Sequence, residues 1–269
     1  MDDAPFREWC GANKVLWPKL AVGSAPGTGR GVLATEAIHE GEVVVEVPDD
    51  AVLMAENCSI AELLAEAGLA KPAADALLEV QGLVVAVMAE RALGIASRWA
   101  PYLGFLPDSM DHMPVYWQPD ELAELRGTAA LDKLEGRVQH PADAPTRVEE
   151  LFGALVVPLV EGDKGLAKAL LGPKGLPSKG KAAEEAKQRL LQQYKWATSA
   201  VASYSFILGD EQFQSMCPVW DLLNHVTGRA NVRLRHDAAR GALQMVATRP
   251  IAAGEEVVNN YGRLCPLSS

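Results

Sequence analysis

Cysteine is scarce in this chain of 269 residues, and so is any pattern typical of metal ligands. Only four cysteines occur, none of them in a Cys-x-x-Cys pair: Cys10, Cys58, Cys217 and Cys265. This spacing argues against a zinc site and against a disulfide framework, and it is typical of a chain that folds in a reducing compartment. The five histidines are equally scattered, so we expect no bound metal.

Long apolar runs and an excess of basic residues are also lacking. The most apolar stretch, residues 83–88, is far shorter than the roughly 20 residues that cross a bilayer. The acidic start, Met-Asp-Asp-Ala-Pro, predicts neither a signal peptide nor a transit peptide. Lysine and arginine number 25 against 35 acidic residues, a net charge of −10. We therefore expect no membrane and no nucleic-acid partner. An acidic surface suits a lysine-rich protein segment, although it also simply keeps a protein soluble.

What is present is typical of a globular protein. Hydrophobic residues make up 49% and charged residues 22%, and the length suits one core with an insertion or two unequal lobes. The β-branched runs at 32–34 and 43–47 predict strands. A helical zone follows, in which Ser59 and Glu62 form a plausible capping signal, and strands and turns return over residues 215–262. Helices are predicted over residues 60–67, 77–93, 120–125, 147–160 and 182–203.

One pattern occurs twice. Residues 34–42 and 247–255 share Ala-Thr-x-x-Ile-x-x-Gly-Glu, followed by valines in both copies. Each copy is interpreted as a strand end, a turn closed by glycine, and a new strand. Two copies that flank a helical zone predict that the two β zones pack together, with the helical zone inserted between them.

A basic loop, residues 172–181, is rich in glycine, proline and lysine. We expect a mobile surface linker there, and the alternative is a role in steering a partner.

Three further stretches carry polar residues that suit chemistry. Residues 26–31 read Gly-x-Gly-x-Gly but precede a strand and lack a Lys-Ser/Thr pair, which excludes a nicotinamide loop and a nucleoside triphosphate loop. A glycine loop that approaches a ligand and a plain tight turn both remain possible.

Residues 220–225 place Asn224 beside His225, which suits a ligand site or a buried turn equally well.

The third stretch, residues 255–262, runs from a strand into Asn-Asn-Tyr-Gly. Its tyrosine, Tyr261, either packs at a strand end or presents its hydroxyl to a reacting centre. A nucleophile–base pair of Cys217 and His225 is a weaker hypothesis, because no oxyanion or third-group signature accompanies it.

Taken in this order, the three stretches resemble the SET-domain protein lysine methyltransferases. The matching residues are 27–34, 221–225 and 259–262, and the long helical insertion is similar to that of the class related to the Rubisco large-subunit methyltransferase. One subgroup of that class is matched further at residues 57–60, 96–102, 203–206 and 245–248. The resemblance implies an α+β fold: a SET fold of small β-sheets with knot-like C-terminal threading and a large helical insertion. It implies an N-terminal part over 1–55, the insertion over 56–195 and a C-terminal part over 196–269.

The resemblance also implies transfer of a methyl group from S-adenosylmethionine to a lysine side chain of a protein substrate. Tyr261 would be the catalytic tyrosine. The resemblance implies that Ser205 and Trp99 contact the substrate lysine. For Trp99, packing between the insertion and the core is the alternative role. The residues implied to contact the cofactor are Gly27, Thr28, Gly29, Arg30, Tyr204, Asn224 and His225.

Relatives of this class continue with a second Tyr-Gly-Phe motif and a helical substrate-binding domain. The sequence stops at Ser269 without either, so the alternative function is a catalytically weak or inactive SET-like binding module. We expect the nucleus or the cytoplasm as its location, with the plastid also open. The substrate protein, the degree of methylation and the oligomeric state are left open.

Overall fold

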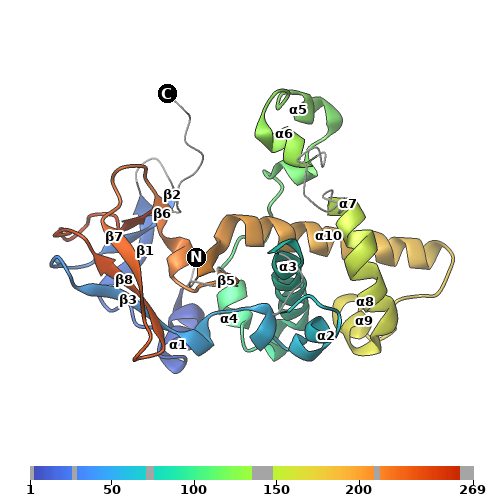
Figure 1. The fold of residues 1–269 in the computed structure, drawn as a ribbon, viewed down its shortest axis with the longest axis horizontal. Coiled ribbons are helices and arrows are strands. Elements are labelled where there is room, and N and C mark those ends of the chain that lie inside the picture. The colour runs from blue at the N-terminus through green and yellow to red at the C-terminus, as the bar shows by residue number, and fades with distance from the viewer. Residues whose placement is uncertain (1–2, 26–28, 71–75, 135–147, 209–212, 261–269) are drawn as a thin grey trace. The chain divides into compact units, whose positions relative to one another are not determined.

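The structure is a computed structural model that describes residues 3–25, 29–70, 76–134, 148–208 and 213–260. The chain forms two compact units (Figure 1). Met1–Met54 and Tyr204–Ser269 form the first, called here the β unit, and Ala55–Ser203 form the helical unit. The helical zone is thus inserted between two β zones, as the sequence pattern predicts.

The described part of the β unit contains four small sheets. β1 pairs with β2 and β4 with β5, both antiparallel; β8 lies between β3 and β7, also antiparallel; and β6 pairs with β9 in parallel. Its helix and strands are α1 (Ala4–Ala12), β1 (Leu20–Ala25), β2 (Gly29–Ala34), β3 (Val43–Pro48), β4 (Ser205–Leu208), β5 (Phe213–Met216), β6 (Asn224–His225), β7 (Val232–Asp237), β8 (Ala242–Ala247) and β9 (Val258–Asn259).

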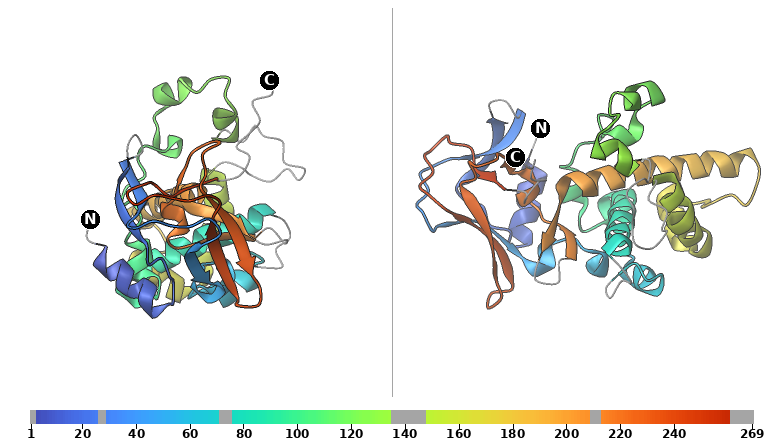
Figure 2. Two further views of the ribbon diagram at one scale, coloured as in Figure 1. Left: turned by 90° about the vertical axis from the view of Figure 1, so that its left-hand side faces the viewer. Right: turned by 45° about the horizontal axis from the view of Figure 1, so that its top comes forward.

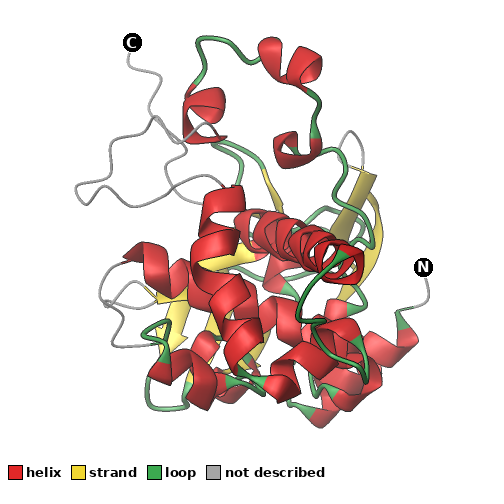
Figure 3. Ribbon diagram, turned by 90° about the vertical axis from the view of Figure 1, so that its right-hand side faces the viewer, coloured by secondary structure: helices red, strands yellow, loops and turns green. Residues whose placement is uncertain are grey.

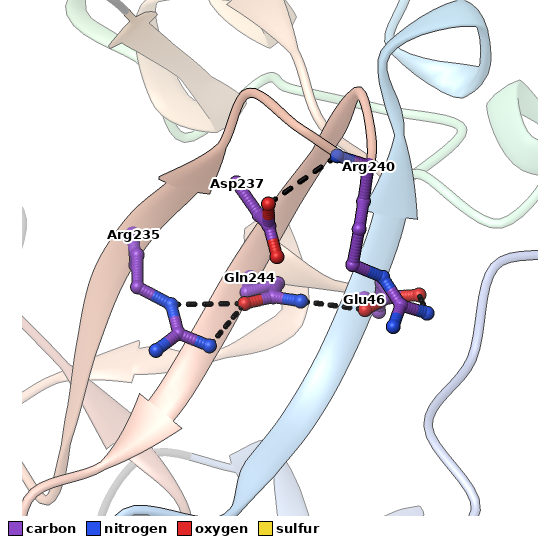
Figure 4. A network of polar contacts seen from close by, with 5 residues as sticks. All are labelled: Glu46, Arg235, Asp237, Arg240 and Gln244. Atoms are coloured by element: carbon purple, nitrogen blue, oxygen red, sulfur yellow. Dashed lines mark hydrogen bonds and ion pairs between the residues drawn. The ribbon is translucent and has the colours of Figure 1, made fainter.

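A polar ladder crosses the sheet β3–β8–β7 (Figure 4). Gln244 on the central strand is buried, and its Oε1 accepts a hydrogen bond of 2.9 Å from Nε of Arg235. Its Nε2 donates to Oε2 of Glu46 at 2.6 Å, and Arg240 binds the other oxygen of that carboxylate at 2.9 Å. Because both ends of the buried amide are satisfied, the ladder supports one register of three strands.

The two copies of the repeated pattern pack against each other. Ile38 and Ile251 occupy the same position in their copies, and each donates its backbone N–H to the carbonyl of the other, at 2.9 and 3.0 Å. Both side chains are buried. The prediction that the two β zones pack together is therefore confirmed at the repeat itself.

The glycines of the repeat continue this two-fold relation. The N–H of Gly41 donates to the carbonyl of Ala247 at 2.8 Å, and the N–H of Gly254 donates to the carbonyl of Ala34 at 2.7 Å. These are the same two positions of the pattern with the copies exchanged. The φ angles of the glycines are +80° and +81°, a left-handed conformation that glycine adopts without a steric penalty.

The glutamates that end the two copies each cap their own turn. Glu42 also forms an ion pair of 2.6 Å with Lys19, and Glu255 forms one of 2.6 Å with Arg249. The cation and the backbone N–H of the turn lower the pKa of each carboxyl. The repeat is thus held by local carboxylate bonds as well as by the pairing of its copies.

The helical unit is built around α3 and α10. Residues 83–89 of α3 are buried on all sides. Within this unit α10 runs as one long helix, with α5 and α6 on one side and α3, α8 and α9 on the other (Figures 1, 2 and 3). No helix in the described part of the chain is both long and apolar enough to span a bilayer. Its helices are α2 (Ala61–Glu66), α3 (Ala76–Leu93), α4 (Ala100–Leu103), α5 (Pro119–Ala123), α6 (Ala129–Leu134), α7 (Val148–Leu151), α8 (Val157–Gly162), α9 (Lys164–Leu171) and α10 (Lys181–Tyr204).

The helix predicted over residues 147–160 is interrupted. A π-helical turn, Phe152–Val156, separates α7 from α8. Pro158 stands in the first turn of α8. Proline has no N–H to donate and its ring clashes with the preceding turn, so a regular α-helix cannot continue through it.

The capping signal predicted at Ser59 and Glu62 is wrong. The N-cap of α2 is Ile60, and no side chain caps it. Instead, the backbone N–H of Ser59 donates to Oε1 of Glu90, a buried carboxylate on α3, at 2.5 Å. The hydroxyl of Ser97 donates to the other oxygen. A buried charge needs such donors, and this requirement outweighs the local capping preference.

Candidate functional site

β9 brings the three chemistry-bearing stretches together. It pairs in parallel with β6, so that His225 lies opposite Asn259. Just before β9, the N–H of Val257 donates to the carbonyl of Val32 in β2 at 2.8 Å. Three segments therefore meet within the β unit: the strand that follows the glycine loop, the Asn-His segment and the strand that leads to Asn-Asn-Tyr-Gly.

The side chain of Asn224 joins these segments. Its Nδ2 donates to the carbonyl oxygen of Arg30 at 2.9 Å and to Oε1 of Glu256 at 2.7 Å. The space around this bond is filled: a Cβ added to Gly31 would lie 2.5 Å from Oε1 of Glu256 and 2.9 Å from Nδ2 of Asn224. Only glycine at position 31 lets the carboxylate and the amide approach the backbone of β2 so closely.

A second asparagine, Asn231, holds β9 from another direction. It is fully buried, its Nδ2 donates to the carbonyl of Glu256 at 2.8 Å, and its Oδ1 accepts the N–H of Val258 at 2.9 Å. The sequence analysis did not select Asn231 or Glu256. The one available signal for Asn231 is its place directly before a strand pattern, which is also common in ordinary turns.

The backbone is exposed at Gly29, the first residue of β2. This residue has a φ of +79°, and a Cβ built on it would meet no atom of the described residues within 4 Å. The backbone here is accessible to a group that approaches closely. Gly27 and Thr28, predicted beside it, lie outside the described residues.

Tyr204 ends α10 and is half-buried. Burial raises the pKa of its hydroxyl; the nearby Arg30 lowers it and Asp221 raises it. The hydroxyl therefore stays protonated at neutral pH, and Tyr204 lies within electrostatic reach of the Arg30 segment that Asn224 binds. Of the predicted site residues, Arg30, Asn224 and Tyr204 are thus brought together.

His225 is also half-buried, and its Nε2 lies 3.0 Å from Oγ1 of Thr227. The turn that leads to this segment carries strain: Val219, buried and β-branched, has a φ of +71°. Such a conformation costs on the order of 1–3 kcal/mol and persists only where the surroundings impose it. Here the next residue, Trp220, packs edge-on against Phe206 with ring centroids 5.9 Å apart.

The structure argues against Cys217 as a nucleophile. Its side chain is fully buried, and this burial, together with Asp221 and Asp49, raises the pKa of the thiol well above its ordinary value. An activated cysteine needs the opposite environment, one that stabilises the thiolate. Within the described ranges, no group of three or more His, Cys, Asp or Glu side chains is placed to hold a metal.

The remaining predicted site residues are Tyr261, Ser205 and Trp99. Tyr261 lies outside the described residues. Ser205 begins β4, and its hydroxyl accepts a hydrogen bond from Nε2 of Gln214. Trp99 belongs to the helical unit, where it is fully buried and packs at 6.5 Å against Tyr102. This is the packing role that the sequence analysis set beside a substrate role, and the substrate roles of Trp99 and Ser205 stay predictions.

The fold of the β unit and the contacts between its three motif segments define the protein family to which the chain belongs. The sequence matches the model of the SET domain over residues 29–262, and the chain belongs to the SET-domain family. Among curated proteins it is similar to the N-lysine methyltransferase SETD6 of Rattus norvegicus, with 30% identity over 97% of this chain and 51% of that protein. The SETD6 of Homo sapiens is 28% identical over 92% of this chain and 48% of that protein. The chain thus spans about half the length of the curated relatives it matches.

Solved structures show the same fold. The SET domain of LSMT bound to lysine and AdoHcy superposes with a TM-score of 0.68 at 20% identity, covering 96% of this chain and 53% of the other. Rubisco LSMT bound to AdoMet gives a TM-score of 0.64 at 19% identity, covering 96% and 52%. The predicted membership of the SET family is confirmed, and the likeness to these LSMT structures is one of fold.

Proposed function

We propose that this chain is the SET part of a protein-lysine N-methyltransferase that uses S-adenosylmethionine. The observation that carries the proposal is the Asn224 side chain, whose Nδ2 bonds Arg30 and Glu256 and so joins the glycine-loop strand, the Asn-His segment and the β9 segment. Two comparisons support the proposal. The curated relatives are named N-lysine methyltransferases, and the structural neighbours are bound to AdoMet or to lysine and AdoHcy.

The described residues suit the cofactor. The open backbone at Gly29 admits a bulky polar ligand, and the half-buried side chains of Arg30, Tyr204, Asn224 and His225 combine donors and acceptors. These residues, with Gly27 and Thr28, would hold S-adenosylmethionine, which when bound supplies the electrophilic methyl group.

The protein's own part in the reaction is mainly positioning. The attacking lysine must be neutral, although its pKa in water is about 10.4, and desolvation lowers that pKa. A tyrosine hydroxyl that stays protonated can orient the amine lone pair without exchanging a proton, and we propose this role for Tyr261. Holding the amine and the methyl donor in line also lowers the barrier, because the reacting groups are then already oriented.

Calorimetric titration with S-adenosylmethionine tests the cofactor site. We expect the native chain to bind and Asn224→Ala to weaken binding at least about tenfold, the equivalent of about 1.4 kcal/mol. Asn13→Ala is the matched control, because Asn13 also donates its Nδ2 to a backbone carbonyl at 2.9 Å, at the end of α1. No binding by the native chain, or equal loss in both variants, would contradict the assignment.

Methyl transfer separates an enzyme from a binding module. With labelled S-adenosylmethionine and a mixture of lysine-rich proteins, the native chain should label protein, and Tyr261→Phe should lower the rate while cofactor affinity is kept. Binding without any transfer would support the binding module instead.

We further propose the nucleus or the cytoplasm as the location. The three described cysteines, Cys10, Cys58 and Cys217, are free thiols, which supports a reducing compartment. Microscopy of a fluorescent fusion of the natural protein tests this, and a secreted or plastid pattern would contradict it.

A further inference from the structure

Lysine is concentrated in one stretch of the helical unit. Six of the eleven lysines of this acidic chain fall between residues 164 and 187, where only two acidic residues stand: Lys164, Lys168, Lys174, Lys179, Lys181 and Lys187 against Glu184 and Glu185. The stretch spans α9, the basic loop and the first turns of α10.

Four of these lysines line one pocket. Its volume is about 480 Å³, and it lies between α8, α9, the loop and the start of α10, all within the helical unit. α9 contributes Lys164 and Lys168, one helical turn apart, the loop contributes Lys174, and α10 contributes Lys187. The volume falls within the range of about 300–1,000 Å³ that is typical of ligand sites.

The positive charge of the pocket is mostly uncompensated. Lys187 pairs with Glu161 at 3.4 Å between Nζ and Oε1, and Glu161 is the single carboxylate among the residues that line the pocket. Within the described ranges, Lys164, Lys168 and Lys174 form no ion pair. Three ammonium groups close together repel one another, so an anionic ligand is favoured here.

The loop that carries Lys174 has a defined conformation. The N–H of Gly172 donates to the carbonyl of Lys168, and the N–H of Gly175 donates to the carbonyl of Gly172, both at 2.9 Å. The φ of Gly175 is +61°, and its Cβ position lies 3.6 Å from Cβ of Ala167 on α9. The loop therefore turns back onto α9 and forms one wall of the pocket.

The pocket also has an apolar side. Val160 on α8, Leu176 and Pro177 in the loop and Ala183 on α10 line it beside the lysines. The charges are spread over three segments, and a lysine is a point charge rather than a planar fork. This arrangement suits several separate carboxylates around an aliphatic side chain better than one compact phosphate.

We propose that this lysine-lined pocket binds an acidic peptide segment of a partner protein. Carboxylates of the segment contact the ammonium groups of α9 and the loop, and an aliphatic side chain packs on Val160 and Leu176. The proposal concerns the helical unit alone, and it stands or falls independently of methyl transfer.

Fluorescence polarisation tests it, with a labelled peptide in which glutamates flank one leucine. Lys168→Glu should weaken binding about tenfold. Lys179→Glu is the matched control: it lies in the loop between α9 and α10 and makes the same change in net charge, but it does not line the pocket. It should change affinity by less than about twofold. Both lysines are exposed, so neither change disturbs the core, and circular dichroism checks this.

Three outcomes would overturn the proposal. The first is that the native chain does not bind the peptide, and the second is that the two variants lose affinity for it equally. The third is that replacing the leucine of the peptide by serine leaves the affinity unchanged. Displacement of the peptide by inorganic phosphate or by anionic lipid vesicles at comparable concentrations would identify a different ligand. Titration of the same variants with S-adenosylmethionine measures binding at the cofactor site of the β unit. A failure of the peptide proposal is therefore distinguishable from a failure of the proposed enzyme function.

Discussion

Gly31→Ala is the most direct perturbation of the site. The added methyl group would lie 2.5 Å from Oε1 of Glu256, 2.8 Å from Cβ of Ala25 and 2.9 Å from Nδ2 of Asn224. All three distances are shorter than van der Waals contact allows, so at least one neighbour must move. The carboxylate of Glu256 and the amide of Asn224 are the groups that can rotate, and their movement breaks the hydrogen bond between them, which joins β6 to the segment before β9.

The magnitude follows from two contributions. Overpacking by one methyl group costs about 1–3 kcal/mol, and loss of the Asn224–Glu256 hydrogen bond, which has a charged acceptor, adds about 1.5–3 kcal/mol if it breaks completely. Partial relaxation lowers the sum, so we expect about 2–4 kcal/mol. At roughly 2–4 °C for each kcal/mol in a chain of this size, the melting temperature should fall by several degrees.

Thermal unfolding followed by circular dichroism measures the loss, and calorimetry with S-adenosylmethionine measures the effect on the site. Gly11→Ala is the control, because a Cβ on Gly11, at the end of α1, meets nothing within 4 Å. It should leave stability unchanged or raise it by up to about 1 kcal/mol.

A double-mutant cycle with Glu256→Ala tests the stated cause. If the clash with the carboxylate dominates, Gly31→Ala should cost less in the Glu256→Ala background, with a coupling energy of about 0.5–3 kcal/mol. Strictly additive costs, or a Gly31→Ala variant as stable and as competent in binding as Gly11→Ala, would refute this reasoning.

Three further perturbations are predicted together. Asn231→Ala removes the side-chain partner of the buried N–H of Val258 and of the part-buried carbonyl of Glu256, so urea unfolding should show a loss of about 1–4 kcal/mol; a loss below about 0.5 kcal/mol would contradict the bracing role. Glu42 and Glu255 have lowered pKa values in the folded protein, so the stability they contribute is present above the unfolded pKa of about 4.3 and is lost as the pH falls through the folded values. Melting temperatures measured between pH 7 and pH 2 should fall less steeply for the double variant Glu42→Gln, Glu255→Gln, and parallel curves would exclude this contribution. Cys217 should resist iodoacetamide at pH 8 in the folded protein and react in urea, because burial raises the pKa of its thiol; rapid labelling of the native chain, read by mass spectrometry, would show that the burial is wrong.

Local patterns predicted most of the regular elements. The valines of β3 and the apolar run of α3 indicate their structure without reference to the rest of the chain, because β-branched residues suit strands and a continuous Ala/Leu/Val run suits a buried helix. α1 was missed, although Phe6, Trp9 and Cys10 stand at helical spacing behind a proline and are all buried. The spacing of these residues does predict a helix, so the sequence contains the information for α1.

The sequence by itself determined the family, the order of the motifs and the packing of the two β zones, because short runs of neighbouring residues carry each of these signals. Only the tertiary structure decided that Asn224 binds the carbonyl of Arg30, 194 positions away, and that Asn231 and Glu256 support β9. Such partners are chosen by which strands lie side by side and by the need to satisfy every buried polar group. No local sequence pattern shows which buried group a side chain will satisfy. The sequence around an asparagine before a strand is the same whether it caps a turn or, as Asn231 does, supports the strand that leads to Tyr261.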